Sequence, residues 1–437
     1  MIWWITLSIL GAVLAGLFAT GLPVALAFLG TNIVGAWIFL GGTSGLDQLV
    51  RNASGAVSSF SLVPIPLFIL MGELLFHCGL AFKAIEAVER MLNRLPARLA
   101  CVTVVGGTAF SALSGSSIAN TALLGSTLSQ DMMKRGYSTT LSLGPAMATG
   151  GIAVLVPPST LAVMLGSLSG ISITQLLIGG IVPGFLMAAG FLLYVILVGV
   201  FDPNSAPRQD TVRVYTFRER YVPFLRDVVP LFGIFVAVIG GMLSGIATPT
   251  EAAALGAMAA FVATICYGKL SWDALRASLA ETAKVSISIL FIIVASTTFS
   301  QILSFSGATT GMLSLVTAVD PTPMTLILSM LLILLLMGCF IDQVSMMMIT
   351  VPLFIPLAQS AGIDLVWLGL MMLVVIELGL LTPPFGILLM VMQGAVKSVP
   401  LVQIYKAALP FILIEILVLG LMIFWPELTT FLPSLTR

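Results

Sequence analysis

Residues 150–159 read GGIAVLVPPS and residues 376–385 read IELGLLTPPF, so two apolar segments each run into a pair of prolines. The two pairs lie 226 residues apart (383 − 157), and the same offset relates GLPVALAFLG at 21–30 to ATPTEAAALG at 247–256. A proline in a helix interior removes an N–H donor and leaves a carbonyl oxygen upstream without its usual partner. We therefore predict two matching halves, each with a discontinuous helix, and a binding site where the broken segments meet.

Composition places the chain in a membrane. Of its 437 residues, 59% are hydrophobic and only 8% are charged, which is more apolar surface than a soluble domain can bury. The solid apolar run TLILSMLLILLLMG at 325–338 shows none of the alternation of a transmembrane β-barrel. The predicted fold class is an all-α polytopic membrane protein with about 10–12 transmembrane segments surrounded by membrane lipid.

Segments of about 20 apolar residues can cross a bilayer. Full crossings are predicted near 3–20, 23–41, 60–79, 139–170 (broken), 173–200, 228–245, 250–268, 284–303, 365–396 (broken) and 401–424. Two further apolar stretches, 99–130 and 325–357, are interrupted by the polar sequences SALSGSSIANT (111–121) and GCFIDQVS (338–345). Because each flank is too short to cross alone, we predict two re-entrant helical hairpins whose tips meet inside the membrane.

Charges at the segment ends set the orientation. The mouth of the second predicted hairpin carries Asp320 and Asp364 and no Lys or Arg, whereas the mouth of the first carries Arg90, Arg94, Arg98, Lys134 and Arg135. The central loop, 201–227, is also basic, with Arg208, Arg213, Arg218, Arg220 and Arg226. By the positive-inside rule, the N-terminus is predicted in the periplasm and the loop in the cytoplasm. Residues 1–200 and 228–437 then form inverted repeats joined by a linker at 201–227.

Two segments, 81–96 and 269–284, combine charged and apolar residues at helical spacing. We predict that both lie at the membrane interface, the second beginning at the helix-start signal of Ser271 and Asp273.

Several function classes are excluded by what the sequence lacks. The net charge of zero argues against a nucleic-acid partner. The only histidine is His77, and the four cysteines are dispersed, so neither a catalytic cluster nor a transition-metal site is predicted. Without a GxxxxGK[ST] sequence the chain cannot hydrolyse ATP through a P-loop. We expect a protein that is not an enzyme and holds no organic cofactor.

Polar residues at the first hairpin tip have the chemistry of a binding site. They are Ser111, Ser114, Ser116, Ser117, Asn120 and Thr121, with Gly115 among them. Hydroxyl, amide and backbone carbonyl oxygens suit a sodium ion, and the N–H groups at a helix N-terminus favour a carboxylate. The alternative is close helix packing, for which membrane helices also use Gly and Ser.

The second tip carries Asp342, Gln343 and Ser345. An aspartate inside the membrane costs roughly 2.5–3.5 kcal/mol on insertion scales and therefore needs a partner. A bound cation is one interpretation, and a protonated Asp342 hydrogen-bonded to backbone is the other. The broken helices add the candidates Thr149, Gly150, Gly151 and the carbonyl groups before Pro157 in the first half, and Thr382, Gly386 and the carbonyl groups around Leu381 in the second.

Other acidic residues lie in apolar segments. Glu377, five residues before Thr382, is a candidate to assist the second site or a proton route. Glu73 and Glu415 are interpreted as structural or as facing a partner subunit. Glu251 is interpreted as a capping residue, because a carboxylate is favoured in the first turn of a helix.

Taken together, these motifs resemble the large membrane (M) subunit of a tripartite ATP-independent periplasmic (TRAP) transporter, within the ion-transporter superfamily. The resemblance spans nearly the whole chain and rests on SGSSIAN (114–120), GGIAVLVPPS (150–159), GIATPTEAAALG (245–256), GCFIDQ (338–343), VPLFIPLA (351–358) and GLLTPPFG (379–386). It implies an elevator mechanism, sodium-coupled symport of an organic acid such as a C4-dicarboxylate, and a place in the bacterial cell inner membrane. It also implies a small four-helix membrane subunit (Q type) and a periplasmic substrate-binding protein (P type) as partners.

The resemblance also implies site residues. A first sodium site falls on Ser114, Ser116, Asn120, Gly150, Gly151 and Val156, and a second on Asp342, Ser345, Thr382 and Gly386. Substrate contacts are expected from Ser116, Ser117, Thr149 and Gln343. We thus expect the permease subunit of a sodium-coupled importer of a small carboxylate delivered by a binding protein. The alternative is a stand-alone sodium- or proton-coupled dicarboxylate or anion transporter without a binding protein.

Overall fold

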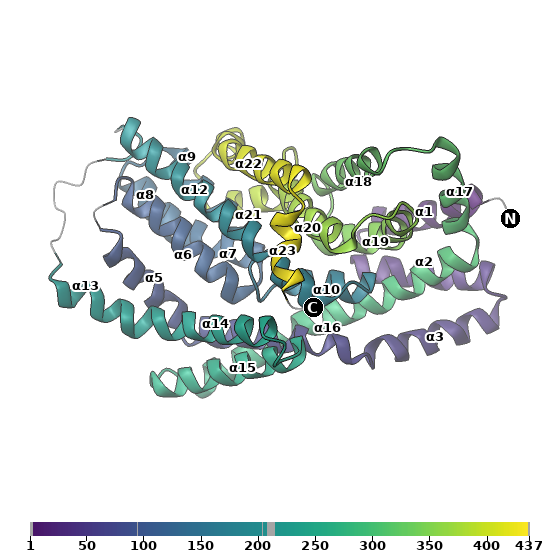
Figure 1. Ribbon diagram of the computed structural model, residues 1–437, viewed down its shortest axis with the longest axis horizontal. Coiled ribbons are helices and arrows are strands. Elements are labelled where there is room, and N and C mark those ends of the chain that lie inside the picture. Colours follow the sequence, from purple (N-terminus) through teal and green to yellow (C-terminus); the bar gives the residue numbers. More distant parts are fainter. Residues whose placement is uncertain (1–2, 94, 203, 208–214, 436–437) are drawn as a thin grey trace.

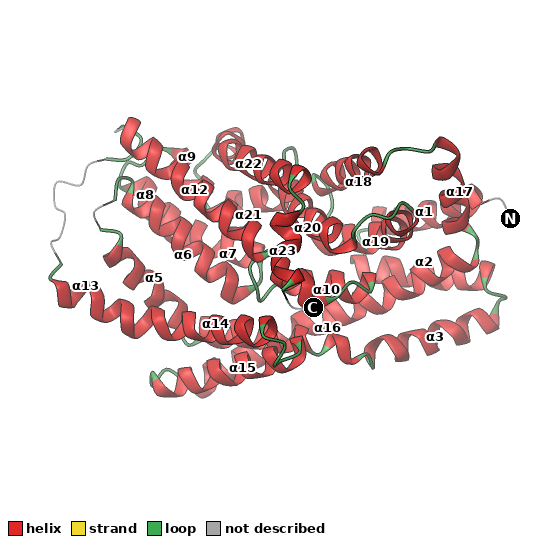
Figure 2. Cartoon of the chain, viewed as in Figure 1, coloured by secondary structure: helices red, strands yellow, loops and turns green. Residues whose placement is uncertain are grey.

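The structure is a computed structural model that describes residues 3–93, 95–202, 204–207 and 215–435, without the side chains of 112–114 and 317. Within these residues every regular element is helical, and Figure 2 shows helices joined by short loops. Arg94, Arg208 and Arg213, which entered the orientation prediction, lie outside the described residues. The prediction of an all-α fold is confirmed.

The first half of the chain contains the helices α1 to α12. Their bounds are α1 (Trp3–Ala19), α2 (Val24–Phe39), α3 (Thr43–Val57), α4 (Pro64–His77), α5 (Leu80–Met91), α6 (Arg98–Ser114), α7 (Ser117–Leu124), α8 (Gln130–Lys134), α9 (Thr139–Ile152), α10 (Thr160–Ser169), α11 (Ile173–Gly179) and α12 (Ile181–Phe201). Short π-helical or 3-10 turns at Phe60–Leu62 and Gly125–Ser129 join neighbouring helices.

The second half contains α13 to α23. Their bounds are α13 (Phe217–Pro223), α14 (Val229–Leu243), α15 (Pro249–Cys266), α16 (Trp272–Phe305), α17 (Ala308–Val319), α18 (Pro323–Gly338), α19 (Gln343–Ser360), α20 (Leu365–Leu381), α21 (Ile387–Ala395), α22 (Leu401–Phe424) and α23 (Glu427–Ser434). A π-helical turn at Phe224–Val228 joins α13 to α14.

The 226-residue offset carries one half onto the other. Moved by 226 positions, α1 and α2 fall on α14 and α15, α6 falls on α18, and α9 and α10 fall on α20 and α21. Each half therefore has a helical hairpin (α6–α8 or α18–α19) and a discontinuous helix (α9–α10 or α20–α21), in two inverted-topology repeats. In Figure 1, α6 and α8 lie to the left of α7, α20 and α21, and α18 lies to their right.

Seven of the described helical segments are long and apolar enough to cross a membrane: Phe60–His77, Ile173–Phe201, Phe217–Leu243, Pro249–Cys266, Trp272–Phe305, Gln343–Ser360 and Leu401–Phe424. Shorter apolar helices, among them α1, α2, α18 and α20, accompany them. This pattern is that of a multi-pass membrane protein.

The double prolines interrupt both discontinuous helices as predicted. Helix α9 ends at Ile152, and α10 begins after Ser159, whose hydroxyl accepts the Ala162 N–H at 3.2 Å. Helix α20 ends at Leu381, and α21 begins after Gly386. Both Pro–Pro peptide bonds are cis.

Two helix starts follow their sequence signals. Glu251 is a capping residue as interpreted: its carboxylate accepts the Thr248 N–H at 2.8 Å, and the Thr248 hydroxyl accepts the Glu251 N–H in return. The Ser271 hydroxyl accepts the Ala274 N–H at 3.1 Å and caps α16.

Two elements differ from the prediction. The expected interfacial helix at 269–284 and the crossing at 284–303 form one continuous helix, the 34-residue α16, because no Gly or Pro separates them. Helix α3 was missed, because its residues at 43–57 include Gly, Ser, Asn and charges. The 226-residue offset maps α3 onto 269–283, so the repeat carried a signal for it.

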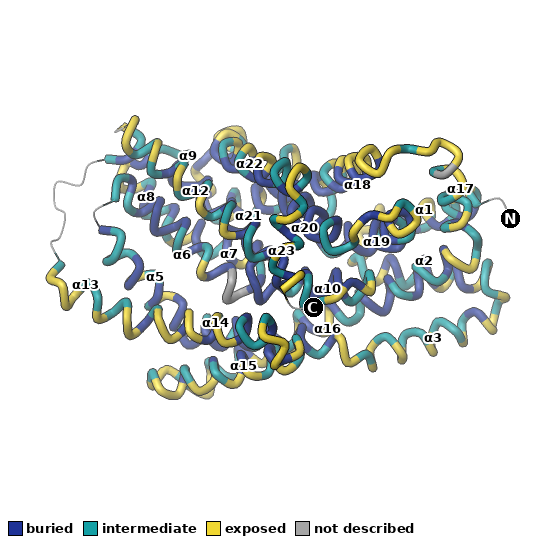
Figure 3. Tube along the Cα trace, in the orientation of Figure 1, coloured by how far each residue is buried: buried dark blue, intermediate teal, exposed yellow. Residues whose placement is uncertain are grey.

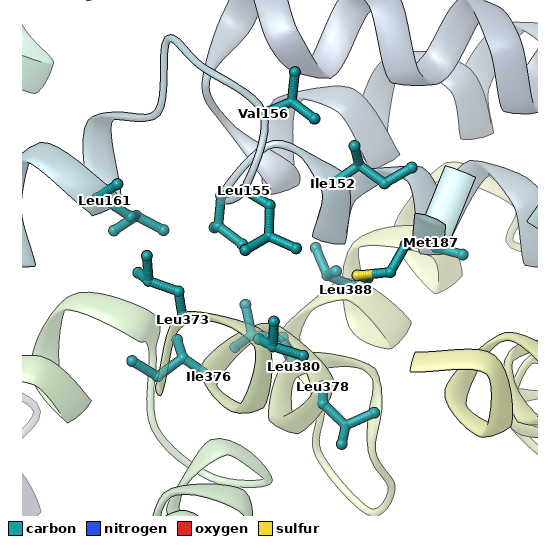
Figure 4. Close-up of a cluster of buried hydrophobic side chains, with 14 of the residues drawn as sticks. Ile152, Leu155, Val156, Leu161, Met187, Leu373, Ile376, Leu378, Leu380 and Leu388 are labelled. Atoms are coloured by element: carbon teal, nitrogen blue, oxygen red, sulfur yellow. The ribbon is translucent and has the colours of Figure 1, made fainter. Parts of the chain in front are cut away.

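The core surrounds α20. Every residue of α20 from Leu368 to Leu381 is buried. Exposed residues line outer helices such as α14, α15 and α3 in Figure 3, and many of the exposed side chains are large and apolar. Figure 4 shows the apolar cluster at the break of the first discontinuous helix, where Leu155 and Ile152 face Leu373 and Leu380 of α20.

Substitution of Gly338 tests a close helix crossing in the core. A Cβ at Gly338 of α18 would lie 2.6 Å from the Gly379 Cα of α20, so Gly338→Ala forces the two helices apart. We expect it to lower the free energy of unfolding by about 1–3 kcal/mol, the usual cost of overpacking. The measurement is the thermal unfolding midpoint (Tm) in detergent.

The matched control is Gly420→Ala in α22, where an added Cβ would meet no atom within 4 Å. Both substitutions favour helix formation equally, so equal midpoints for the two variants would contradict the packing at Gly338.

Candidate functional site

The tip of the first hairpin rests on the break of the first discontinuous helix. Helix α6 ends at Ser114, Gly115 turns the chain with φ of +61°, and the Ser116 hydroxyl caps α7 by accepting the Ala119 N–H at 3.3 Å. The Gly115 carbonyl accepts the Thr160 hydroxyl at 3.1 Å. A Cβ on Gly115 would lie 3.2 Å from the Pro158 carbonyl oxygen, so the turn and the proline pair are in contact.

A buried polar network holds this tip against α9. The Asn120 amide donates to the Ser111 hydroxyl at 2.7 Å and to the Thr149 hydroxyl at 3.2 Å. The Ser111 hydroxyl donates to the Thr149 carbonyl oxygen at 2.6 Å. The Asn120 Oδ1 atom is buried, and the structure records no hydrogen-bond donor for it among the described residues. This oxygen is therefore a buried acceptor that can take a further partner.

Most of the first predicted sodium set gathers here. Gly150 faces the hairpin, since a Cβ there would lie 3.1 Å from the Ser117 carbonyl oxygen. Val156 is buried at the break, directly before Pro157, and Ser116 lies at the tip. Gly151 points away from the tip, toward Glu415. Ser114 ends α6, and its side chain lies outside the described part of the chain.

At the second tip, Asp342 caps α19. One carboxylate oxygen accepts the N–H groups of Val344 and Ser345 at 3.1 and 3.2 Å, and the other accepts the Ser345 hydroxyl. Backbone N–H groups of the helix N-terminus thus serve as partners of the membrane aspartate, as in the interpretation that gave it hydrogen bonds to backbone, and they do so as a helix cap. A capped carboxylate still has free lone pairs for a cation.

The second break lies beside this tip. A Cβ on Gly386 would overlap the Leu380 carbonyl oxygen and lie 2.9 Å from that of Thr382, so two backbone oxygens converge at this glycine. The Thr382 hydroxyl donates to the Leu378 carbonyl at 2.7 Å. The rings of Phe340 and Phe385 lie 5.7 Å apart and connect the hairpin to the break.

The two hairpin tips meet at equivalent positions of the repeats. Ser117 is the first residue of α7, and Gln343, 226 positions later, is the first residue of α19. The Gln343 amide nitrogen lies 3.2 Å from the Ser117 hydroxyl, and both groups donate to the same oxygen of Glu377 in α20. Ser117 and Gln343 are 2% and 9% exposed, so the contact lies deep inside the protein.

The substrate candidates are therefore engaged within the protein in this conformation. Ser117 and Gln343 bind Glu377, and the buried Thr149 hydroxyl donates to the Pro145 carbonyl at 2.9 Å. Ser116 lies at the partly exposed end of the tip. Only Ser116 of the four is accessible from the surface.

A second buried glutamate was assigned no site. Glu415 of α22 is fully buried, and its Oε1 lies 3.1 Å from the position of a Cβ at Gly151, on the same side as Glu377. It faces the interior and not a partner subunit. Among the described residues, neither of its oxygens has a hydrogen-bond donor, nor does Oε2 of Glu377. Glu73, by contrast, pairs with His77 at 3.1 Å on α4.

Comparison with known families agrees with this architecture. The family model described as "Tripartite ATP-independent periplasmic transporter, DctM component" matches residues 11–428. A crystal structure of the YdaH transporter of Alcanivorax borkumensis is similar in fold, with a TM-score of 0.57 over 88% of this chain and 89% of that chain. Its sequence identity is 15%, so the likeness concerns the fold alone.

The alignments with sequence relatives cover most of this chain and most of each relative. The C4-dicarboxylate TRAP transporter large permease protein DctM of Pseudomonas aeruginosa is 32% identical over 86% of this chain and 86% of its own. The sialic acid TRAP transporter large permease protein SiaM of Vibrio cholerae is 27% identical over 96% of both. The ectoine TRAP transporter large permease protein TeaC of Halomonas elongata is 27% identical over 98% of this chain and 99% of its own.

Proposed function

The chain belongs to the DctM component family of tripartite ATP-independent periplasmic (TRAP) transporters, and from this premise we propose that it is the permease subunit of a sodium-coupled importer of a small organic acid. The substrate reaches it from a periplasmic binding protein, and a small membrane subunit accompanies it. The relatives are transporter permease subunits and not enzymes. The chain is a multi-pass protein of the inner membrane, and we propose a periplasmic N-terminus and a cytoplasmic loop at 201–227.

The observation that carries the proposal is the pairing of each hairpin tip with a helix break. At the first, the turn at Gly115 contacts the Pro158 carbonyl and Thr160. At the second, the carbonyl groups of Leu380 and Thr382 converge at Gly386. Freed carbonyl oxygens with nearby hydroxyl groups form the hard-oxygen environment of a sodium ion, and such breaks are where transporters bind coupling ions.

The proposed ligands follow this grouping. The first ion takes oxygens from Ser114, Ser116, Asn120, Gly150 and Val156, with Gly151 behind them, and the second from Asp342, Ser345, Thr382 and Gly386. Among these, Asn120 has a buried oxygen without a recorded donor, and Asp342 contributes a carboxyl group that accepts the Val344 N–H. Two ligand sets of this kind suit an elevator mechanism, in which the hairpins and broken helices move together against the remaining helices.

The substrate is proposed to be a carboxylate, as the names of the C4-dicarboxylate and sialic acid relatives suggest. No Lys or Arg lies in α7, α9, α10, α18, α19, α20 or α21 to bind an acid group. The positive N-terminal ends of α7 and α19 and the bound sodium ions are left to balance its charge.

Transport provides the first test. In proteoliposomes with both partners and the acid that mass spectrometry finds on the binding protein, an inward sodium gradient should drive accumulation. Each net positive charge that enters gains about 2.3 kcal/mol per 100 mV, so replacing sodium with potassium should lower accumulation more than about tenfold. Accumulation in potassium under a pH gradient would contradict sodium coupling, and uptake without the binding protein would favour the stand-alone alternative.

Sodium binding provides a second test that needs no substrate. A ligand at about one hundred times its Kd stabilises the folded state by about 2.7 kcal/mol, so sodium chloride should raise the Tm of the purified protein above its value in potassium chloride. Asp342→Asn should reduce this sodium-specific increase, because the variant keeps a helix cap but loses the charge.

Asp364→Asn is the matched control. Asp364 also caps a helix, accepting the Trp367 N–H at 2.9 Å, but it lies at the far end of α20 from the break. An equal loss of the sodium effect in the two variants would show that the second site is not at Asp342.

A further inference from the structure

A chain of hydrogen bonds connects the two proposed ion sites. Ser117 directly follows Ser116, a proposed ligand of the first ion, and Gln343 directly follows Asp342, a proposed ligand of the second. The residues that follow the two helix caps are therefore the ones that contact each other, at 3.2 Å. Ser117 of one tip and Gln343 of the other are therefore in direct contact.

Glu377 binds both residues of this contact. A single oxygen, Oε1, accepts hydrogen bonds from both the Ser117 hydroxyl and the Gln343 amide. Glu377 is fully buried, and its two donors are nearly so. Because water cannot replace a hydrogen bond lost in such an interior, separating the tips would leave three polar groups without partners at once.

The backbone that carries Glu377 is also fixed to the second site. Glu377 lies five residues before Thr382, on the stretch of α20 that is completely buried. Two residues after it, Gly379 meets Gly338 of α18 at backbone distance, which ties α20 to the second hairpin. Glu377 therefore lies on a helix that contacts the second hairpin through Gly379 and the first hairpin through Ser117.

The helices around this contact are almost free of charged residues. Helices α7, α9, α10, α18, α20 and α21 contain no Lys, Arg, His or Asp, and Glu377 is their one carboxylate. Helix α19 has only its cap Asp342, and Tyr194 of α12 packs on Phe411. Glu415 of α22 faces the same region, but the structure records no hydrogen bond from it to either tip.

We propose that Glu377 is the positioning residue that couples the two sodium sites, so that an ion bound at one tip raises the affinity of the other. This inference rests on the proposed function. The tips then have two discrete arrangements, joined through Glu377 or separated, and each ion favours the joined one. Energetic coupling between two sites requires such a shared two-state element, and typical couplings change affinity about 5- to 150-fold.

Equilibrium binding of radioactive sodium to the purified protein with its small membrane partner, without substrate, tests the coupling. For a coupling of about 5- to 150-fold, the wild-type curve should have a Hill coefficient of about 1.4 to 1.8, and Glu377→Ala should lower it toward about 1 with the same number of ions bound. Glu377→Gln should keep the cooperativity, because its amide oxygen accepts the same two hydrogen bonds. A structural defect alone would lower the number of ions bound and not the steepness.

A double-mutant cycle measures the coupling directly. Asp342→Asn removes the second ion, and in an otherwise wild-type chain it should weaken the first site by about 5- to 150-fold. In the Glu377→Ala background the same substitution should leave the first site unchanged, because the sites are already independent. Glu73→Gln, an acidic residue of α4 paired with His77, is the control that should retain full cooperativity.

Should Glu377→Ala fail to fold, Ser117→Ala removes only the hydroxyl that joins the tips and should give the same loss of steepness. Unchanged cooperativity in these variants, or an equal effect of Asp342→Asn with and without Glu377, overturns the coupling while sodium binding stands. Absence of saturable sodium binding by the wild type overturns the proposed function, and the coupling falls with it.

Discussion

A helix that ends inside this protein leaves backbone N–H and C=O groups without hydrogen-bond partners. Other parts of the chain must supply these partners, because lipid cannot form hydrogen bonds with them and bulk water does not reach the interior. The hairpin turns and the proline breaks are such ends, and they lie against each other. Thr160, at the start of α10, donates to the Gly115 carbonyl, while Ser116 and Asp342 cap the helices that leave the two tips. The hairpins and the discontinuous helices thus bring capping side chains and backbone carbonyl groups together, which accounts for the polar centre.

The two repeats share a backbone plan but differ in charge. Each acid near the centre belongs to the second repeat, and 226 positions earlier stands a small residue: Ser116 for Asp342, Gly151 for Glu377, and Ala189 for Glu415. The exchange has a steric reason at Gly151, which leaves the space that the Glu415 carboxylate fills. The centre is thus symmetric in fold and asymmetric in its acidic side chains, all three of which belong to the second repeat.

The sequence was sufficient for the breaks, the hairpins and the repeat, because prolines, glycines and long apolar runs act locally on the backbone. The caps at Thr248 and Ser271 could be predicted from the sequence in the same way. The environment of Glu415 was not, since its neighbours Gly151 and Glu377 are distant in sequence and no motif surrounds it. Asp342 was recognised as a membrane aspartate in need of a partner, but its local role as a helix cap depends on where α19 begins, which the polar run GCFIDQVS does not fix.

The acidic side chains also bear on the order in which sodium and the acid bind under the proposed function. The N-terminal ends of α7 and α19 favour an anion, but in this conformation the Glu377 carboxyl group already takes the donors of Ser117 and Gln343. With Asp342 beside them and no Lys or Arg on α7, α9, α10 or α18 to α21, an approaching carboxylate finds acidic side chains and no basic one. A carboxylate that enters such an interior needs a cation beside it. Under the proposed function we therefore expect sodium to bind before the acid, because the ion supplies the positive charge that these helices lack.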